Sequence, residues 1–251
     1  MPKDASSSCA GSALCLRSVT RIILFLFLVI GTQTARAQQP ATRNEVWPEI
    51  DVYINVKPKV RLYLIGAVSK AVEDGDFRNA KGYEEQVGVH IDYILNEHVI
   101  LRTGYRFGKS LGETTEPYKE HRLVTEQTLR KLLPGDLLLS DRNRQDFRFV
   151  NGDFSFRYRN RVTIEREFHP FKKRTITPYV SGEIFYDSRY SIWNRNRLAV
   201  GVQTSLRHGT PLRMLLPKRQ VILDLYFLRQ NDSRAETPHV NGIGAALTFY
   251  F

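Results

Sequence analysis

The feature of the sequence that most limits its fold is a period-two alternation of apolar and polar residues, which returns in short segments along most of the chain. In residues 49–56, every even position is apolar and every odd position is polar or Tyr. Successive side chains of a strand point to opposite faces, so such a segment is predicted to be a β-strand with one apolar and one polar face. Apolar residues at helical spacing are hard to find. The same alternation occurs in residues 60–69, 86–93, 99–107, 154–168, 175–187, 195–206, 221–230 and 241–251.

The composition of the polar face distinguishes a transmembrane barrel from a soluble sandwich. In a sandwich that face meets water and can carry many lysines. Here it is rich in Arg, Glu, Asp, Tyr, Ser and Gly with almost no Lys, which suits an enclosed lumen whose side chains pair with one another. An apolar outer band around a polar interior is the pattern of membrane barrels. We therefore expect an all-β fold, an antiparallel up-and-down transmembrane β-barrel, although 42% hydrophobic residues would also suit a soluble domain.

The number of strands follows from eleven segments, of which residues 120–130 and 137–149 alternate only weakly. Bacterial single-chain barrels normally have an even number of strands. We therefore expect 10–12 strands, with 12 favoured and 10 as the alternative, in a barrel formed by residues 47–251. Residues 38–46 are polar and reach about 30 Å when extended, enough to cross a membrane. They are interpreted as a polar N-terminal arm that threads the lumen.

The N-terminal segment has the parts of a secretory signal peptide. A basic start is followed by an apolar run at residues 22–30 and by Ala-Arg-Ala at residues 35–37. We expect cleavage before Gln38, so that residues 1–37 are removed. An uncleaved anchor is the alternative, but the run is shorter than the ~20 residues of a spanning helix. Both cysteines precede the cut, so the exported chain is expected to lack disulfides, thiol nucleophiles and a lipid anchor.

The C-terminal segment carries the most specific single signal. Residues 241–251 alternate to the last residue and end on Phe. This segment resembles the terminal strand that the barrel-assembly machinery of Gram-negative bacteria recognises; a sandwich edge strand ending on Phe by chance is the alternative. The predicted location is the outer membrane, with that machinery, periplasmic chaperones during export and outer-membrane lipids as partners. The residues assigned to the assembly signal are Gly244, Leu247, Phe249 and Phe251.

Five short motifs occur in a fixed order along the chain. They are Trp47-Pro48-Glu49, Gly104-Tyr105-Arg106, residues 157–161, residues 196–201 and residues 239–251. Together they resemble an uncharacterised Gram-negative outer-membrane β-barrel family, classed as a domain of unknown function, with a Trp-led first strand, Arg-rich central strands and a Phe-terminated last strand. The resemblance covers most of the exported chain. It implies a barrel and an outer-membrane location, and it implies no activity.

The lengths of the connections assign the two sides of the membrane, because outer-membrane barrels have short periplasmic turns and longer outer loops. The links at 57–59, 95–98, 131–136, 169–174 and 207–219 are placed in the periplasm. Much of the formal net charge of +11 falls there, and this basic rim is hypothesised to meet anionic phospholipid head groups. Solubility of the turns before insertion is the alternative. The residues of the rim are Lys57, Lys59, Lys172, Lys173, Arg174, Lys218 and Arg219.

The polar face is predicted to form a charge network inside the lumen. Arg suits such a network because its planar group binds carboxylates through two hydrogen bonds. Salt bridges that brace the wall are the favoured interpretation, and an Arg-lined anion path is the alternative. With 10–12 strands and long Arg side chains, the lumen should be narrow or closed. The network residues are Arg102, Arg106, Arg142, Arg144, Arg157, Arg159, Arg161, Arg195, Arg197, Glu49, Asp51, Glu165, Glu167, Glu183, Asp187 and Asp224.

Motifs for catalysis are weak. Residues 239–242 faintly resemble the His-x-Ser-Asn of outer-membrane lipases, but Asn241 stands where the Ser would be. The six histidines lack metal-ligand spacing and no nucleotide-binding motif occurs, so no cofactor, metal or catalytic residue is assigned. An exported barrel is not expected to bind nucleic acid. We predict a structural or accessory barrel, with a narrow channel or transporter for small solutes, anions among them, as the alternative and an outer-membrane lipid hydrolase third.

Overall fold

The computed structural model describes residues 42–72, 81–110, 117–171, 174–206, 220–234 and 239–251. Every regular element in this part of the chain is a β-strand. The strands are β1 (Thr42–Lys57), β2 (Val60–Val72), β3 (Lys81–Ile94), β4 (Val99–Ser110), β5 (Lys119–Leu133), β6 (Leu137–Val150), β7 (Asp153–Arg166), β8 (Phe168–Phe171), β9 (Arg174–Asp187), β10 (Ile192–Ser205), β11 (Gln220–Asp232) and β12 (His239–Tyr250).

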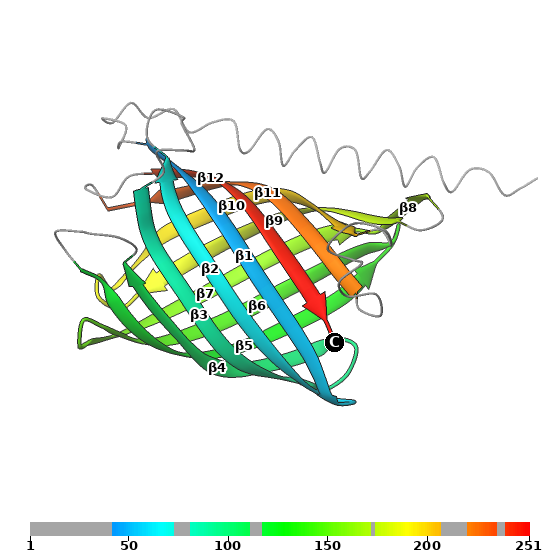
Figure 1. Ribbon diagram of the computed structural model, residues 1–251, viewed down its shortest axis with the longest axis horizontal. Helices are drawn as coiled ribbons and strands as arrows, with labels where there is room; N and C mark the ends of the chain where they lie inside the picture. Colours follow the sequence, from blue (N-terminus) through cyan, green and yellow to red (C-terminus); the bar gives the residue numbers. More distant parts are fainter. Residues whose placement is uncertain (1–41, 73–80, 111–116, 172–173, 207–219, 235–238) are drawn as a thin grey trace, which may run out of the picture. The chain divides into compact units, whose positions relative to one another are not determined.

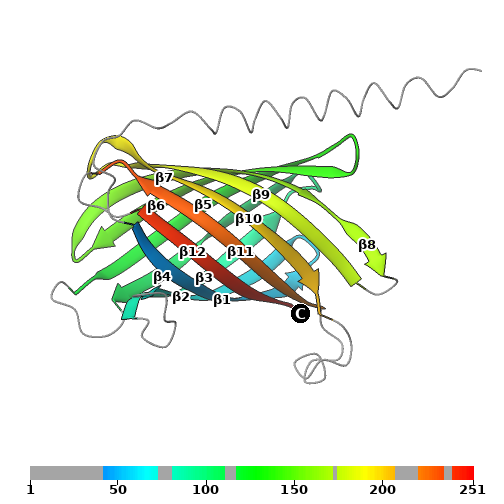
Figure 2. The same cartoon turned by 90° about the horizontal axis from the view of Figure 1, so that it is seen from above.

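The strands close into a barrel of tilted strands (Figures 1 and 2). Eleven of them form the ring: β1 to β7 follow one another, β9 pairs with both β7 and β10, and β12 pairs with β1. The prediction of an all-β barrel with 10–12 strands is confirmed. The twelfth strand is the four-residue β8, which pairs with β9 beside the ring where a turn was expected at residues 169–174.

The seam between β1 and β12 is parallel, whereas the other pairs are antiparallel. When strands alternate in direction around a ring and their number is odd, the first and last strands must be parallel. The seam runs from Thr42 opposite His239 to Tyr53 opposite Tyr250. The prediction of an N-terminal arm at residues 38–46 is wrong for Thr42–Val46. These residues belong to β1 and pair with β12, so they do not cross the lumen. Residues 38–41 lie outside the described residues, as does the expected signal peptide.

Two tight turns show how local sequence sets the connections. Asn151 and Gly152 join β6 to β7, with φ angles of 52° and 99°. Positive φ at both positions is the geometry of the two-residue Asn-Gly hairpin. Gly135 and Asp136, also at positive φ, join β5 to β6 at the other end of the barrel. We call the end that contains Phe251 and residues 134–136 the C-terminal rim, and the end that contains residues 151–152 the opposite rim.

The two faces of the wall follow the alternation in the sequence. Outward positions carry exposed apolar side chains, such as Ile50, Val200 and Phe227. Inward positions carry buried charged ones, and Asp92, Asp146 and Asp187 are 0% exposed. In the described part of the chain, no helix is long and apolar enough to cross a membrane. The core of this molecule is therefore a polar interior, bordered by a small apolar cluster of Ala199, Leu228 and Val240.

Candidate functional site

The centre of the lumen is organised around one carboxylate. Glu183 on β9 receives the guanidinium groups of Arg159 and Arg161 from β7, at 2.8 and 2.9 Å. Arg142 from β6 lies at 3.3 Å and Arg197 from β10 at 3.5 Å. Strand pairing explains the convergence, because Glu183 is in register with Arg161 on one neighbour and with Arg197 on the other. Four cations therefore surround a single buried anion.

A second group of pairs extends the network toward β2 and β5. Arg102 donates to Asp92 from Nε at 2.6 Å and from Nη2 at 3.0 Å, which is a two-bond contact. Arg61 donates to the same carboxylate at 2.7 Å. Glu126 lies between Arg102 and Arg142, at 3.9 and 3.8 Å from their nitrogens. Asp92 and Glu126 thus connect the first half of the barrel to the Glu183 centre.

Two other predicted arginines lie between these groups. Arg144 is 2% exposed and donates to Asp146 at 2.6 Å. Arg106 makes a different contact from the expected ion pair: its Nε donates to Nε2 of His90 at 3.2 Å. That bond requires His90 to be neutral at Nε2, because a protonated ring has no acceptor there. His90 was not among the expected network residues.

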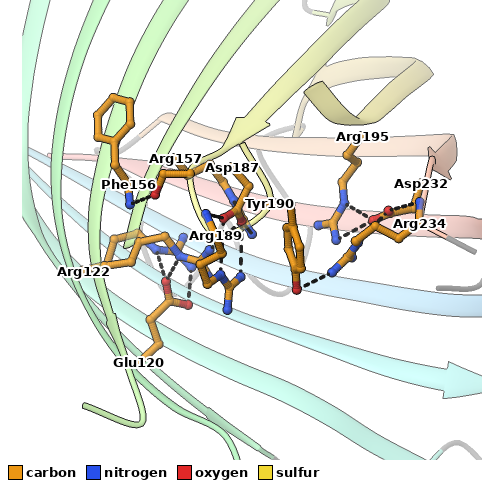
Figure 3. A network of polar contacts seen from close by, with 12 residues as sticks. Glu120, Arg122, Phe156, Arg157, Asp187, Arg189, Tyr190, Arg195, Asp232 and Arg234 are labelled. Atoms are coloured by element: carbon orange, nitrogen blue, oxygen red, sulfur yellow. Dashed lines mark hydrogen bonds and ion pairs between the residues drawn. The ribbon is translucent and has the colours of Figure 1, made fainter. Parts of the chain in front are cut away.

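A further cluster lies toward the opposite rim, as Figure 3 shows. Asp187 at the end of β9 accepts from Arg157 at 2.7 Å and from Arg148 and Arg189 at 3.2 Å each. Arg148 also contacts Glu120, and Arg122 donates to Glu120 at 2.6 Å. Because Arg148 lies on β6 and Asp187 on β9, this contact reaches past β7. The cluster therefore links strands that are not neighbours in the wall.

The same rim carries a contact between two connections. Asp232 at the end of β11 accepts from Arg195 at 3.1 Å and from Arg234 at 2.6 Å. Nη1 of Arg234 donates to the hydroxyl of Tyr190 at 2.9 Å (Figure 3). The hydrogen bonds to Asp232 raise the pKa of Arg234, which lies outside the strands. The link after β11 is thus tied to the link between β9 and β10.

An aromatic stack lines the lumen at the seam. Tyr53 lies between Tyr63 and Tyr250, with ring centroids 4.6 and 5.0 Å apart. The Tyr63 hydroxyl donates to Asp51 at 2.7 Å, and the guanidinium of Arg102 lies 3.9 Å from the Tyr63 ring centroid. The stack therefore spans β12, β1 and β2. The alternation in the sequence puts these tyrosines on the polar face, but they were not among the predicted network residues.

Of the four remaining predicted acids, three lie on inward positions and one does not. Asp224 accepts from the Tyr179 hydroxyl at 3.1 Å and from Gln203 at 3.3 Å, so its partners are not arginines. Glu49 and Glu165 are half-buried on inward positions. Glu167 is corrected: its side chain is 58% exposed and lies 3.2 Å from His169, outside the lumen. The reason is that β7, and with it the alternation of inward and outward side chains, ends at Arg166, one residue before Glu167.

Some members of the network were not among the predicted residues. Glu120 and Asp232 are buried; Glu120 contacts Arg122 and Arg148, and Asp232 contacts Arg195. Arg122 and Arg148 lie on the polar face of the predicted segments 120–130 and 137–149, and Glu120 has the same strand parity as Arg122, so the alternation itself indicates all three. Arg189 and Arg234 lie beyond strand ends, and no periodic signal could have indicated them.

The rim and assembly residues are placed as follows. Lys57 and Lys59 are exposed at the C-terminal rim. Arg174 begins β9, and Lys172, Lys173, Lys218 and Arg219 lie outside the described residues. In β12, Gly244 faces inward beneath the Tyr226 ring, where an added Cβ would come within 1.9 Å of it. The predicted assembly residues Leu247, Phe249 and Phe251 share the outward parity of the exposed Ile243.

The residues of the lipase-like motif lie at the start of β12. Nδ1 of His239 accepts from the backbone N–H of Asp232 at 3.4 Å. Asn241 accepts from Arg229 at 2.8 Å. Neither contact contains a hydroxyl nucleophile. Among the described residues, no three His, Cys, Asp or Glu side chains come together as metal ligands.

Comparisons with known proteins agree with this architecture. The family model described as "Protein of unknown function (DUF2490)" matches residues 44–232. LpxR from Salmonella typhimurium is similar in structure, with a TM-score of 0.51 at 8% identity over 79% of this chain and 86% of that one. The β domain of the Bordetella autotransporter BrkA matches with a TM-score of 0.37, at 16% identity over 68% and 78% of the two chains.

A third solved structure, OmpT of Vibrio cholerae with loop L8 deleted, matches with a TM-score of 0.36, at 8% identity over 68% of this chain and 57% of that one. No curated protein sequence matches the chain. At 8% identity, the likeness to LpxR shows a shared β-barrel fold alone. The family match covers most of the barrel, so the chain belongs to the DUF2490 family of proteins of unknown function.

Proposed function

We propose that this protein is a structural or accessory barrel of the Gram-negative outer membrane whose lumen is closed by its own charged side chains. The observation that carries the proposal is burial inside the lumen: Arg144 is 2% exposed, and Asp92 and Asp146 are 0% exposed. A water-filled channel would leave such side chains exposed to solvent. Side chains that bury one another instead fill the lumen and close it to solvent.

The contacts that support closure reach between strands that are not neighbours. Arg102 on β4 donates to the Tyr53 hydroxyl on β1 at 3.3 Å. The guanidinium of Arg197 on β10 lies 4.6 Å from the Trp47 ring centroid on β1. Eight-stranded barrels are filled by side chains and sixteen-stranded ones leave a channel. A ring of eleven strands can be closed if long side chains bridge it, as these arginines do.

Location and assembly form part of the same proposal. The signal peptide at residues 1–37, cleavage before Gln38 and recognition of the β12 ending by the assembly machinery follow from the sequence patterns. The basic rim at Lys57 and Lys59 faces the periplasm in this arrangement. Its partners are anionic phospholipid head groups.

Conductance measurements test closure. Purified wild-type protein in a planar bilayer is expected to be silent. Arg144→Ala combined with Arg161→Ala removes two long side chains from the lumen and is expected to give stepwise conductance. Arg229→Ala is the matched control, since Arg229 has outward parity and bonds to Asn231 and Asn241. Stepwise conductance by the wild type would overturn the proposal.

A narrow anion path is the second candidate, because of the charge around Glu183. Four guanidinium groups share this carboxylate. In addition, Nη2 of Arg144 and Nε of Arg161 and Arg197 are buried without a hydrogen-bond partner in the described part of the chain. If the wild type conducts, its reversal potential in a KCl gradient should show chloride selectivity, and Arg161→Gln should reduce that selectivity.

A further inference from the structure

The outward face of β5, β6 and β7 carries a polar patch where a membrane barrel normally carries apolar side chains. These strands are neighbours in the wall (Figure 2). Inward positions such as Glu126 and Arg144 alternate with the residues of this patch, which therefore point away from the lumen. We call it the β5–β7 patch; its residues are Thr125, Gln127, Asp141, Asn143, Gln145, Tyr158 and Asn160.

The patch contains two groups of hydrogen-bonded side chains. Nδ2 of Asn160 donates to Asp141 at 2.6 Å, and Nδ2 of Asn143 donates to the same carboxylate at 3.1 Å. The Tyr158 hydroxyl donates to Asn143. Farther along the strands, the Thr125 hydroxyl donates to Gln145 at 2.8 Å. The side chains of Thr125 and Gln127 are exposed at the β5 edge of the network.

Apolar residues border the patch along its own strands. Toward the opposite rim, Leu123 and Phe147 are exposed and outward. Toward the C-terminal rim, Leu129, Val162 and Ile164 are exposed and outward. The patch therefore lies at the depth of the lipid tails, away from both layers of head groups.

Apolar residues also border the patch on the neighbouring strands. Leu101 on β4 is in register with Gln127, and Ile184 on β9 is in register with Asn160. Their side chains are 38% and 46% exposed. At these two positions, apolar side chains on the neighbouring strands therefore border the patch. A polar or ionisable group on the lipid face is unfavourable, most of all at the membrane midplane, and marks a functional surface.

We propose that the β5–β7 patch is the contact surface for a second copy of this chain, an inference that rests on the proposed location in the outer membrane. Two copies inserted in the same direction hold their patches at the same depth, so that polar groups meet polar groups and the apolar borders meet each other. Amide and hydroxyl groups both donate and accept. Asn143 and Asn160 donate to the Asp141 carboxylate within each copy, so the amides and hydroxyls of the patch are the groups that can pair with a second copy. A two-fold axis along the membrane normal, the commonest symmetry of protein dimers, brings the patches together.

Cysteine cross-linking in outer membranes tests the pairing directly. Gln127→Cys, Asn143→Cys and Asn160→Cys are made separately in the full-length chain, whose own two cysteines lie in the expected signal peptide. After mild oxidation, at least one variant is expected to give a disulfide-linked species of twice the monomer mass. Val200→Cys is the control, because Val200 is 52% exposed on outward β10.

Three results would overturn the proposal. They are the absence of a cross-link at all three positions, equal cross-linking at Val200→Cys, and cross-linking only to a different protein. Heat-modifiable migration on gels establishes for each variant that the barrel is folded in the membrane. A folded, membrane-inserted monomer would therefore reject the dimer and leave the proposed location intact.

The mass of the protein in lipid nanodiscs gives a second measurement. Asn143→Leu and Gln127→Leu place apolar side chains where lipid would otherwise meet polar ones, so the barrel should remain folded. The dimer fraction is expected to fall at least tenfold relative to the wild type. An unchanged dimer fraction would contradict the assignment of the interface. Val200→Asn is the control: it places a polar side chain on the outward face of β10, away from the patch, and should not change the dimer fraction.

Discussion

Single residues in this lumen act mainly as counter-ions. Glu183 balances several arginines, and its side chain is almost entirely buried. Breaking a buried ion pair by removing one partner leaves an uncompensated charge, which costs more than the pair contributes as a whole. Glycines act through shape instead: Tyr226 covers Gly244, and Tyr179 covers Gly201 in the same way. Both effects give predictions about single substitutions.

Glu183→Gln is expected to destabilise the folded barrel by about 3 kcal/mol, because four guanidinium groups would lose their shared anion. The measurement is the free energy of unfolding in urea, in lipid vesicles. Glu167→Gln is the control and should stay within about 0.5 kcal/mol of the wild type, since that side chain is exposed. Equal stability of Glu183→Gln and the wild type would contradict the assigned role of Glu183.

Gly244→Ala is expected to destabilise the barrel by about 1–3 kcal/mol, because the new Cβ would overlap the Tyr226 ring. Gly182→Ala is the matched control: nothing lies within 4 Å of the position of its Cβ. Urea midpoints of the two variants in the same vesicles provide the comparison. Equal urea midpoints of the two variants would contradict a close contact between Gly244 and the Tyr226 ring.

At the scale of elements, the sequence pattern predicted some strands better than others. For strands with one apolar face, such as β1 and β11, the predicted segments 49–56 and 221–230 lie within the observed strands. Residues 120–130 and 137–149 alternated weakly because β5 and β6 carry polar residues on both faces. The extra residues at the start of β1 were missed because they are polar, although the backbone bonds of a strand do not depend on side-chain polarity.

The parallel seam can be tested with a designed disulfide. Val46 on β1 is in register with Ile243 on β12. Val46→Cys with Ile243→Cys is expected to form an intramolecular disulfide on oxidation, because neighbouring strands lie within the Cα separation that a disulfide allows. Val46→Cys with Val200→Cys is the negative control. If the first pair stays reduced in folded protein, Thr42–Val46 does not pair with β12 as described.

At the scale of the whole molecule, the charges are distributed between the interior and the rims. Carboxylates balance much of the Arg charge in the lumen, while Lys57 and Lys59 remain exposed at the C-terminal rim. Each such lysine contributes about 1 kcal/mol at an anionic membrane surface. In the proposed location, these lysines are the groups expected to meet anionic lipid.

Lys57→Gln with Lys59→Gln is expected to slow insertion into vesicles that contain phosphatidylglycerol, while insertion into neutral vesicles is unchanged. High salt should remove the difference, because it screens exposed charges. Lys119→Gln, at the exposed start of β5 on the opposite rim, is the control. Equal insertion rates in anionic vesicles for the wild type and the double variant would reject lipid contact by the rim.

The sequence by itself determined the strand-rich fold, the two faces of most strands and the inward position of the arginines, because the side-chain period of a strand is a local property of the backbone. Only the tertiary structure decided which charges meet. Glu183 collects arginines from three other strands, and Arg148 reaches past β7, as a result of strand order and register. Closure also required the whole ring: eleven strands force a parallel seam, and no single segment contains that information.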